Sequence, residues 1–269
     1  VPLAGDGRTD LDALEAACNE DTAAVCIGYP NFYGVIDDVG GAARLAHDCG
    51  ALAVSVTGEA LSLGLLAAPG RCGADIAVAE GQSLGLPPSY GGPGVGLFAT
   101  REKFVRQMPG RVVGETIDEQ GRRGYVLTLA TREQHIRRER ATSNICTNQG
   151  LAALAVTVYL SVTGRRGLAR LAALNAVRAH EVAERLAAEA GVSPVFDGPF
   201  FNEFTVPEPK APGWYETAVA AGVVPGVRTA ELAPGEPQAA GRLLIAVTEC
   251  TGDADVDLLV RALREARAA

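Results

Sequence analysis

Lysine is nearly absent from this chain of 269 residues, which contains only Lys103 and Lys210. Chemistry that needs a lysine amine, such as imine formation with a carbonyl cofactor, must therefore use one of these two residues. Lys103 stands in the polar stretch REKFVRQM and Lys210 in the proline-rich stretch PEPKAPG. Both contexts are typical of solvated surface lysines, so the sequence disfavours a cofactor carried on a lysine of this chain.

Positive charge is also in deficit. Lys and Arg number 24 against 32 Asp and Glu, which gives a formal net charge of −8 and a pI of about 5.0. Non-specific nucleic-acid binding depends on a basic surface, so we expect no nucleic-acid partner. With 48% hydrophobic residues, the composition is that of an ordinary globular protein with a substantial core.

Long apolar runs and closely spaced cysteines are missing as well. The longest apolar run, LAALAVTVYL from Leu151, is too short to span a bilayer, and there is no signal-peptide pattern. The short run leads us to expect no membrane segment. The cysteines lack the spacing of zinc ligands or redox motifs, so we expect no metal site and buried, reduced thiols. The six cysteines are Cys18, Cys26, Cys49, Cys72, Cys146 and Cys250.

Apolar strands alternate with helices in the first hundred residues. AAVCIGYP, ALAVSVT, ADIAVA and VGLFAT are predicted strands, and GGAARLAHDCG is a predicted helix between the first two. Strands that are apolar on both faces and separated by helices predict βαβ units and a mainly parallel sheet, hence an α/β fold class. Because the chain opens at Val1 on what resembles a strand end, we expect an N-terminal part of its domain to be missing.

Other elements are predicted beyond residue 110. RVVGETIDEQGRRGYVLTL, residues 111–129, predicts a hairpin around an Asp-Glu-Gln-Gly turn. A long helix is expected from about residue 150 to 190, with a break at Thr163-Gly164. PVFDGPFFNEFTVP and RLLIAVT are predicted strands, and WYETAVAAG and DADVDLLVRALREARAA are predicted helices. We therefore expect a large domain over residues 1–163 and a smaller C-terminal α/β domain over residues 164–269.

One long loop, EGQSLGLPPSYGGPGVG at residues 80–96, joins the third and fourth predicted strands without any lysine, histidine or cysteine. A phosphate- or dinucleotide-binding loop is one interpretation, but that fingerprint opens a helix, whereas this loop leads into a strand. A plain surface connection made of turns is a second interpretation. A connection of this length without secondary structure is, however, usually functional.

A third interpretation comes from a resemblance to a known family. Residues 74–100, ADIAVAEGQSLGLPPSYGGPGVGLFAT, and the stretch that follows them are similar to the first subunit of glycine dehydrogenase (decarboxylating), the P-protein of the glycine cleavage system. DTAAVCIGYPNFYGVIDDV at residues 21–39 resembles the same family. The resemblance covers most of the chain and implies the aminotransferase-like, fold-type I fold of pyridoxal-phosphate-dependent transferases. Residues 1–163 would then be the C-terminal part of its large domain.

The resemblance gives the loop a meaning. In a catalytic member of that fold, the loop after the ADI-type strand carries the lysine that binds the cofactor, and an aspartate on the preceding strand holds the pyridine nitrogen. Gln82 or Ser83 takes the place of the lysine here, and Val56 or Thr57 takes the place of the aspartate. The resemblance therefore implies a relic of a cofactor loop, kept as scaffold, and no covalent cofactor on this chain.

A function and partners are implied in the same way. In the two-subunit form of the family, the second subunit carries pyridoxal phosphate, and the subunits assemble as an α2β2 heterotetramer. Glycine is decarboxylated on that cofactor, and the remaining aminomethyl group passes to the lipoyl arm of the H-protein. This chain would be the subunit without the lysine, inactive alone and located in a bacterial cytoplasm.

The segment ATSN, residues 141–144, is a candidate for contact with the partner's cofactor. Fold relatives carry a Gly-Thr-x-Asn segment here, whose hydroxyl meets the cofactor phosphate of the neighbouring subunit, so the resemblance points to Thr142 and then Ser143. A hydroxyl beside a helix N-terminus suits an anion. Capping of the following helix by Ser143 or Asn144 is an equally good alternative.

A basic run precedes this segment. Between Arg101 and Arg140, ten basic residues stand against six acidic ones. Arginine suits carboxylates, phosphates and interfaces, so glycine, the partner's phosphate or an acidic patch of the H-protein could bind here; a solvated helix face is the alternative. The candidates for substrate or interface contact are Arg132, His135, Arg137, Arg138, Arg140 and Asn144.

Two other functions stay open. A self-sufficient pyridoxal-phosphate enzyme of other specificity is opposed by the presence of only two lysines. A catalytically inert scaffold subunit would keep the fold without any share in the active site. Substitution of Thr142 or of the arginines between Arg132 and Arg140 in an assembled complex distinguishes the scaffold from a subunit that takes part in catalysis.

Overall fold

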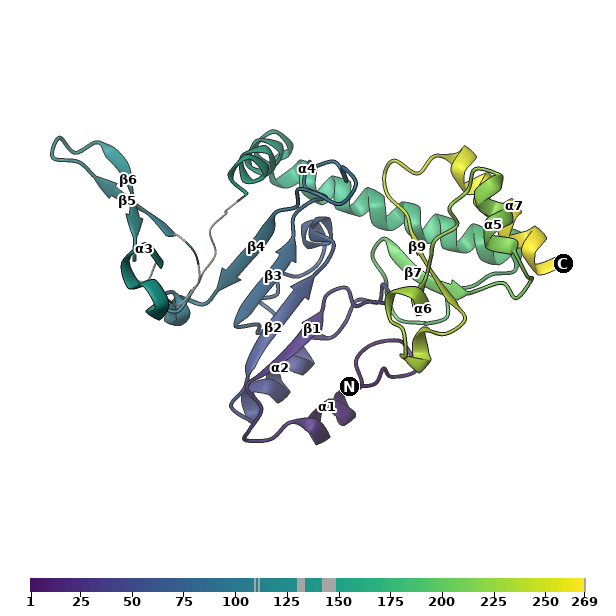
Figure 1. Cartoon of the computed structure of the whole chain (residues 1–269), viewed down its shortest axis with the longest axis horizontal. Coiled ribbons are helices and arrows are strands. Elements are labelled where there is room, and N and C mark those ends of the chain that lie inside the picture. Colours follow the sequence, from purple (N-terminus) through teal and green to yellow (C-terminus); the bar gives the residue numbers. More distant parts are fainter. Residues whose placement is uncertain (109, 111, 130–133, 142–148, 269) are drawn as a thin grey trace.

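The structure is a computed structural model that describes residues 1–108, 110, 112–129, 134–141 and 149–268. Within these residues, a four-stranded sheet, a separate hairpin and a three-stranded sheet follow one another along the chain (Figure 1). The strands of the first sheet are β1 (Ala24–Gly28), β2 (Leu52–Thr57), β3 (Ile76–Glu80) and β4 (Gly96–Thr100).

The first sheet has the strand order β1-β2-β3-β4, with β1, β2 and β3 parallel and β4 antiparallel to β3. The predicted mainly parallel sheet and the α/β class are therefore confirmed. Gly28 pairs with Val56, and Thr57 pairs with Ala79. This register brings the carboxyl ends of the three parallel strands to one edge of the sheet.

Two helices pack on this sheet, α1 (Leu11–Ala17) and α2 (Val39–Asp48), and they also contact each other. Asp10 and Asp38 are their N-caps, and each carboxylate accepts a hydrogen bond from the N–H three residues on, at 3.0 and 2.9 Å. Their apolar residues form a core with β1 and β2. Burial of this face holds the βαβ unit together.

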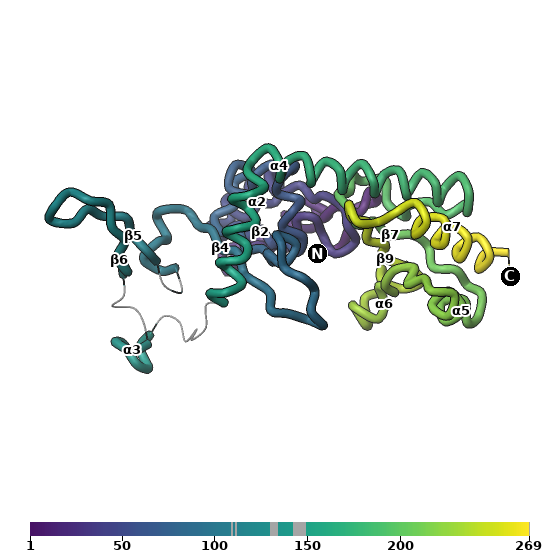
Figure 2. Tube along the Cα trace, turned by 90° about the horizontal axis from the view of Figure 1, so that it is seen from above, coloured from purple at the N-terminus to yellow at the C-terminus, as the bar shows by residue number. Residues whose placement is uncertain are grey.

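The hairpin consists of β5 (Val112–Ile117) and β6 (Arg123–Thr128), as predicted. Asp118 closes its turn, because one carboxylate oxygen accepts hydrogen bonds from the N–H groups of Gln120 and Arg122, both at 2.9 Å. The hairpin projects beyond β4 at one end of the molecule (Figures 1 and 2). We call residues 112–128 the arm. The short helix α3 (Gln134–Arg137) follows the arm in the chain.

The longest helix, α4 (Gly150–Arg185), joins the two halves of the molecule. At Gly164 the backbone leaves the helical region, with φ +61° and ψ 175°, so the predicted break is confirmed. Figure 2 shows that the two segments of α4 run in different directions. A single π-helical turn, Leu186–Ala190, ends the helix. No helix among the described residues is long and apolar enough to cross a membrane.

The C-terminal sheet is antiparallel, with the strand order β7-β9-β8. The prediction of PVFDGPFFNEFTVP as one strand was wrong, because only its last five residues form a strand, and Phe200 makes just an isolated bridge with Val35. The two-residue strand β8 and helix α6 were not predicted. The elements are β7 (Glu203–Pro207), α5 (Trp214–Ala220), β8 (Val227–Arg228), α6 (Thr229–Leu232), β9 (Arg242–Ala246) and α7 (Asp253–Ala268).

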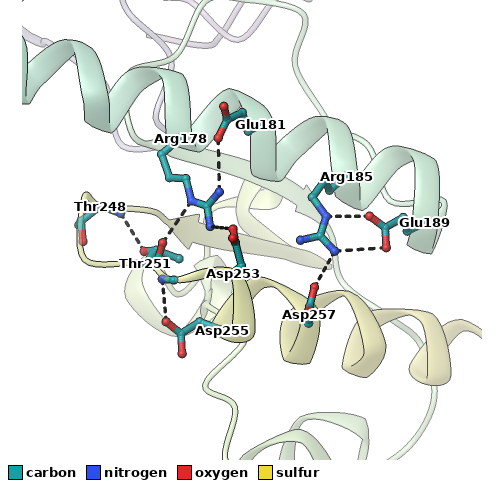
Figure 3. A network of polar contacts seen from close by, with 10 residues as sticks. Arg178, Glu181, Arg185, Glu189, Thr248, Thr251, Asp253, Asp255 and Asp257 are labelled. Atoms are coloured by element: carbon teal, nitrogen blue, oxygen red, sulfur yellow. Dashed lines mark hydrogen bonds and ion pairs between the residues drawn. The ribbon is translucent and has the colours of Figure 1, made fainter.

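The end of α4 packs with α7 and the C-terminal sheet around one apolar core. Ion pairs connect the two helices on the outside of this core (Figure 3). The Arg178 guanidinium lies 2.6 Å from the Asp253 carboxylate, and that of Arg185 lies 2.8 Å from Asp257. The division of the chain into residues 1–163 and 164–269 stays a prediction; it places the boundary at the helix break.

The described cysteines are free thiols, and Cys146 lies outside the described residues. Cys18, Cys49 and Cys72 are partly buried, whereas Cys26 and Cys250 are exposed. The expectation of buried thiols was therefore wrong for these two. Cys26 is exposed because side chains alternate along β1, and its neighbours in the strand take the core side.

Candidate functional site

Three loops leave the carboxyl edge of the parallel strands, after β1, β2 and β3. Open α/β sheets bind ligands at this edge. The C-terminal sheet meets the first loop here, since the Thr205 hydroxyl donates a hydrogen bond to the Tyr33 carbonyl at 2.9 Å. A backbone bridge between Val35 and Phe200 makes a second connection. The candidate site therefore lies where the two sheets meet.

Glu80 closes the long loop between β3 and β4. One oxygen of its carboxylate accepts hydrogen bonds from the N–H groups of Gln82 and Val95, both at 3.0 Å. The side-chain amide of Gln82 also donates to the Pro87 carbonyl at 3.4 Å. The Glu80 carboxylate thus connects the start of the loop to its end.

The same loop packs against the first segment of α4. Leu84 and Val95 are buried in a cluster with Ala152 and Val156 of the helix. Gly85 has φ +95°, and a Cβ atom there would lie 2.7 Å from the Tyr159 ring. Only glycine fits this contact. The loop is therefore an integral, packed part of the fold.

The positions of the expected cofactor lysine and aspartate hold other chemistry. Gln82 and Ser83 are partly buried, and the Ser83 hydroxyl has no hydrogen-bond partner among the described residues. Val56 is 41% exposed at the end of β2, while Thr57 is buried. None of these side chains is an amine or a carboxylate, so they offer neither the imine nor the ion pair that pyridoxal phosphate needs.

Both lysines lie elsewhere. Lys103 follows β4, and its amine lies 3.4 Å from the carboxylate of Asp75, which directly precedes β3. It therefore lies at the amino edge of the parallel strands, opposite Gln82. Lys210 is exposed in the connection between β7 and α5. The residues of this chain do not fit a covalently held pyridoxal phosphate.

Asp75 is the centre of a polar cluster that sequence reasoning missed. Its carboxylate is 2% exposed and lies 2.7 Å from His47 Nε2 and 3.2 Å from Arg101 Nε, and it accepts a hydrogen bond from the Ala53 N–H at 3.1 Å. Burial alone would raise the pKa of Asp75, but hydrogen bonds from His47, Ala53 and Lys103 outweigh burial and lower it. The available signal was an aspartate directly before β3 and the charged run at residues 101–103 directly after β4.

The first loop, YPNFYG, is mainly structural. The Asn31 side-chain oxygen accepts hydrogen bonds from the Tyr33 and Val35 N–H groups at 3.0 and 3.2 Å, and its amide donates to the Gly7 carbonyl at 2.8 Å. Tyr29 is 6% exposed, and burial raises the pKa of its phenol. Tyr33 is 8% exposed, so both tyrosines of the loop serve as packing residues.

Arg242, the first residue of β9, was not singled out from the sequence. Its guanidinium lies 4.7 Å from the Phe196 ring and 5.7 Å from the Tyr33 ring, and its buried Nη1 has no hydrogen-bond partner among the described residues. Burial raises the pKa of Tyr33, and the charge of Arg242 opposes this. No local pattern distinguishes this arginine from others in the sequence.

Two carboxyl groups also approach each other at this edge. Glu59 follows β2, and Glu203 begins β7. Burial raises the pKa of Glu203, and the negative charge of Glu59 adds to the effect. Glu59 itself caps the one-turn helix after β2 by accepting a hydrogen bond from the Leu61 N–H at 2.8 Å. Among the described residues, no group of three or more His, Cys, Asp or Glu could hold a metal ion.

The structure does not bring the predicted basic residues to this edge. His135 lies in α3 and Arg138 in the turn that follows it, and both are exposed, as are Arg137 and Arg140. Figures 1 and 2 both place α3 beyond β4, apart from the loop with Gln82 and Ser83. The other candidates, Arg132, Thr142, Ser143 and Asn144, lie outside the described residues.

The strand order and the loops at this edge define the aminotransferase-like fold of pyridoxal-phosphate-dependent enzymes. Solved structures with low identity share it. A NifS-like protein aligns with a TM-score of 0.62 and 19% identity, over 98% of this chain and 66% of that one. The apo structure of a cysteine desulfurase from Thermococcus onnurineus NA1 gives 0.68 and 17%, over 98% and 64%.

Residues 7–263 match the model of the glycine cleavage system P-protein family, and the chain belongs to this family. It is 56% identical to a probable glycine dehydrogenase (decarboxylating) subunit 1 from Anaeromyxobacter dehalogenans, over 98% of this chain and 59% of that protein. A subunit 1 from Rhodospirillum rubrum is 53% identical, over 95% and 57%. The chain thus spans less than two thirds of these relatives.

A solved glycine decarboxylase (P-protein) in inhibitor-bound form has the same architecture. It aligns with a TM-score of 0.87 and 43% identity, over 98% of this chain and 58% of that one. The predicted family and fold are therefore confirmed.

Proposed function

We propose that this chain is the subunit without the cofactor-binding lysine in a two-subunit glycine dehydrogenase (decarboxylating) of the glycine cleavage system, working in the bacterial cytoplasm. The observation that supports the proposal is the loop closed by Glu80, in which the family resemblance leads us to expect the cofactor lysine and the chain has Gln82 and Ser83. The name "subunit 1" of its relatives implies a second subunit. That subunit would hold pyridoxal phosphate, which supplies an electron sink for decarboxylation of bound glycine.

The aminomethyl group left by glycine would then pass to the lipoylated H-protein. Within the assembly we propose Thr142 and Ser143 as contacts of the partner's cofactor phosphate. Arg132, His135, Arg138 and Asn144 would bind the glycine carboxylate or line the interface. The exposure of His135 and Arg138 supports this role, because their side chains are accessible to a partner.

The arm is the first surface that we assign to the second subunit. Val113, Ile117, Tyr125 and Leu127 share one of its faces by register and are 60%, 72%, 61% and 61% exposed. We call these four side chains the arm face. A two-stranded hairpin alone is marginally stable in water, and contiguous exposed apolar side chains mark interaction sites. A second subunit that covers the arm face would stabilise the hairpin and bury its exposed apolar side chains.

The first segment of α4 offers a second apolar surface. Leu151, Leu154, Val158 and Val162 follow one another at helical spacing and are 83%, 59%, 54% and 84% exposed. Both surfaces belong to the same half of the molecule (Figure 2). We propose that they are buried together in an α2β2 heterotetramer.

The location of the cofactor tests this proposal. The chain and a lysine-bearing second subunit are incubated with pyridoxal phosphate, separately and mixed, then reduced with borohydride, and the mass of each chain is measured. We expect the added mass on the second subunit only, and glycine–bicarbonate exchange only in the mixture. Added mass at Lys103 or Lys210 would instead identify a self-sufficient pyridoxal-phosphate enzyme.

An inert scaffold subunit is the second candidate, favoured by the packing of the β3–β4 loop against α4. A Thr142→Val variant of the mixed complex distinguishes the two. Loss of exchange activity in a complex that still elutes as the full assembly supports participation in the active site. Unchanged activity supports the scaffold.

A further inference from the structure

Two cysteines lie together at the ends of neighbouring helices. Cys18 is the C-cap of α1 and Cys49 is the C-cap of α2. The Cys49 thiol donates a hydrogen bond to the Ala46 carbonyl oxygen at 3.2 Å, and it lies close enough to Cys18 to help raise the pKa of the Cys18 thiol. Both side chains pack against the core of α1, α2 and the sheet. The two side chains are therefore neighbours on the packed side of two contacting helices.

The pair can be reached from solvent. Both residues are only partly buried. A cavity of about 310 Å³ beside β1 is lined by Cys18, together with Thr22 and Cys26. A water molecule occupies roughly 30 Å³ of liquid volume, so this cavity admits a small oxidant such as hydrogen peroxide. Cys18 is the member of the pair that such an oxidant meets first.

We propose that Cys18 and Cys49 form a reversible disulfide when the protein meets hydrogen peroxide. The Cys18 thiolate attacks one peroxide oxygen, the O–O bond breaks, and a sulfenic acid and water result after protonation. The Cys49 sulfur then attacks the Cys18 sulfur, the S–O bond breaks, and a second water leaves with the Cys49 proton. Two thiols are oxidised, one peroxide is reduced to two waters, and a dithiol reductant reverses the reaction.

The disulfide would constrain the part of the chain between residues 18 and 49, which includes the first loop of the candidate site. It would join the ends of α1 and α2 and so enclose β1 and the YPNFYG loop. Such a link restricts the unfolded chain and stabilises the fold. Burial raises the pKa of the Cys18 thiol, and Cys49 adds to this effect. Because the thiolate is the reactive form, we expect slow oxidation that needs excess peroxide.

Peptide mapping tests the proposal on the folded chain. The protein is treated with hydrogen peroxide, remaining thiols are alkylated, and tryptic peptides are analysed by mass spectrometry. Cleavage after Arg8, Arg44 and Arg71 separates residues 9–44 from residues 45–71. We expect these two peptides joined, with the loss of two hydrogen atoms, and separated again by dithiothreitol. The thermal unfolding midpoint should rise on oxidation and return on reduction.

Cys26 lies on the same peptide as Cys18 and supplies the matched control. Cys26→Ser should leave the joined peptides and the shift in midpoint unchanged, whereas Cys18→Ser and Cys49→Ser should each abolish both. Joined peptides that persist in Cys18→Ser would overturn the assignment. So would wild-type protein that gains only oxygen atoms on cysteine and forms no joined peptides.

Discussion

At the scale of single residues, Asp75 connects the most elements of the first sheet. Its buried carboxylate binds groups from α2, from β2 and from the segment after β4. Removing the charge gives the exposed basic groups and a buried backbone N–H a neutral partner in place of a carboxylate. We expect Asp75→Asn to lower the free energy of unfolding by about 2 kcal/mol, measured by urea denaturation. Asp48→Asn, an exposed change at the end of α2, should cost less than ~0.5 kcal/mol.

The effect of Asp75→Asn should depend on pH. Because the folded state lowers the pKa of Asp75, its ionised carboxylate contributes stability above the ordinary aspartate pKa of about 3.9. That contribution is lost as the pH falls through the lowered folded-state pKa. The wild type and Asp75→Asn should therefore differ fully at neutral pH and converge in acid. If the difference in free energy of unfolding between the two proteins grew on acidification, the lowered pKa of Asp75 in the folded state would be contradicted.

At the scale of elements, the contact between the β3–β4 loop and α4 has its own test. Gly85→Ala would place a methyl group 2.7 Å from the Tyr159 ring, whereas Gly91→Ala in the same loop meets nothing within 4 Å. Both glycines have positive φ, so both variants carry backbone strain. Overpacking should make Gly85→Ala less stable than Gly91→Ala by about 2 kcal/mol. Equal stabilities in thermal or urea unfolding would mean that this loop is not packed on α4.

Local patterns predicted the elements better than the contacts between them. The strands, the Asp-Glu-Gln-Gly hairpin and the break at Gly164 follow from apolar periodicity and glycine, which act over a few residues. The two residues of β8 carry no periodic signal. The Glu80 contact with Val95 and the cluster at Asp75 join residues far apart in the sequence. Such pairings depend on the sheet order, which sequence pattern alone does not give.

The candidate site shows the same division. The place of Gln82 and Ser83 in a loop after β3 followed from the local glycine and proline pattern, because strand and loop are contiguous in sequence. Arg242 comes to Tyr33 and Phe196 only through the packing of the C-terminal sheet on the first loop. Its ring contacts could not be predicted from its neighbours in β9.

At the scale of the whole molecule, the arm face should matter for assembly and little for folding. Leu127 is 61% exposed on this face, while Val126 is 50% exposed on the opposite face of the same strand. We expect Leu127→Asp to weaken binding of the second subunit by about 2 kcal/mol, measured by titration calorimetry. Val126→Asp should bind as the wild type does, and both variants should unfold like it. Equal losses of binding in the two variants would remove the arm face from the interface.

The central claim is that catalysis by the complex uses no lysine of this chain. A double variant, Lys103→Arg with Lys210→Arg, removes both lysines and keeps their charge. Glycine–bicarbonate exchange is measured after mixing this variant with the lysine-bearing second subunit and pyridoxal phosphate. Our account predicts the exchange rate of the wild-type complex. Loss of exchange in a variant that still folds and assembles would contradict it.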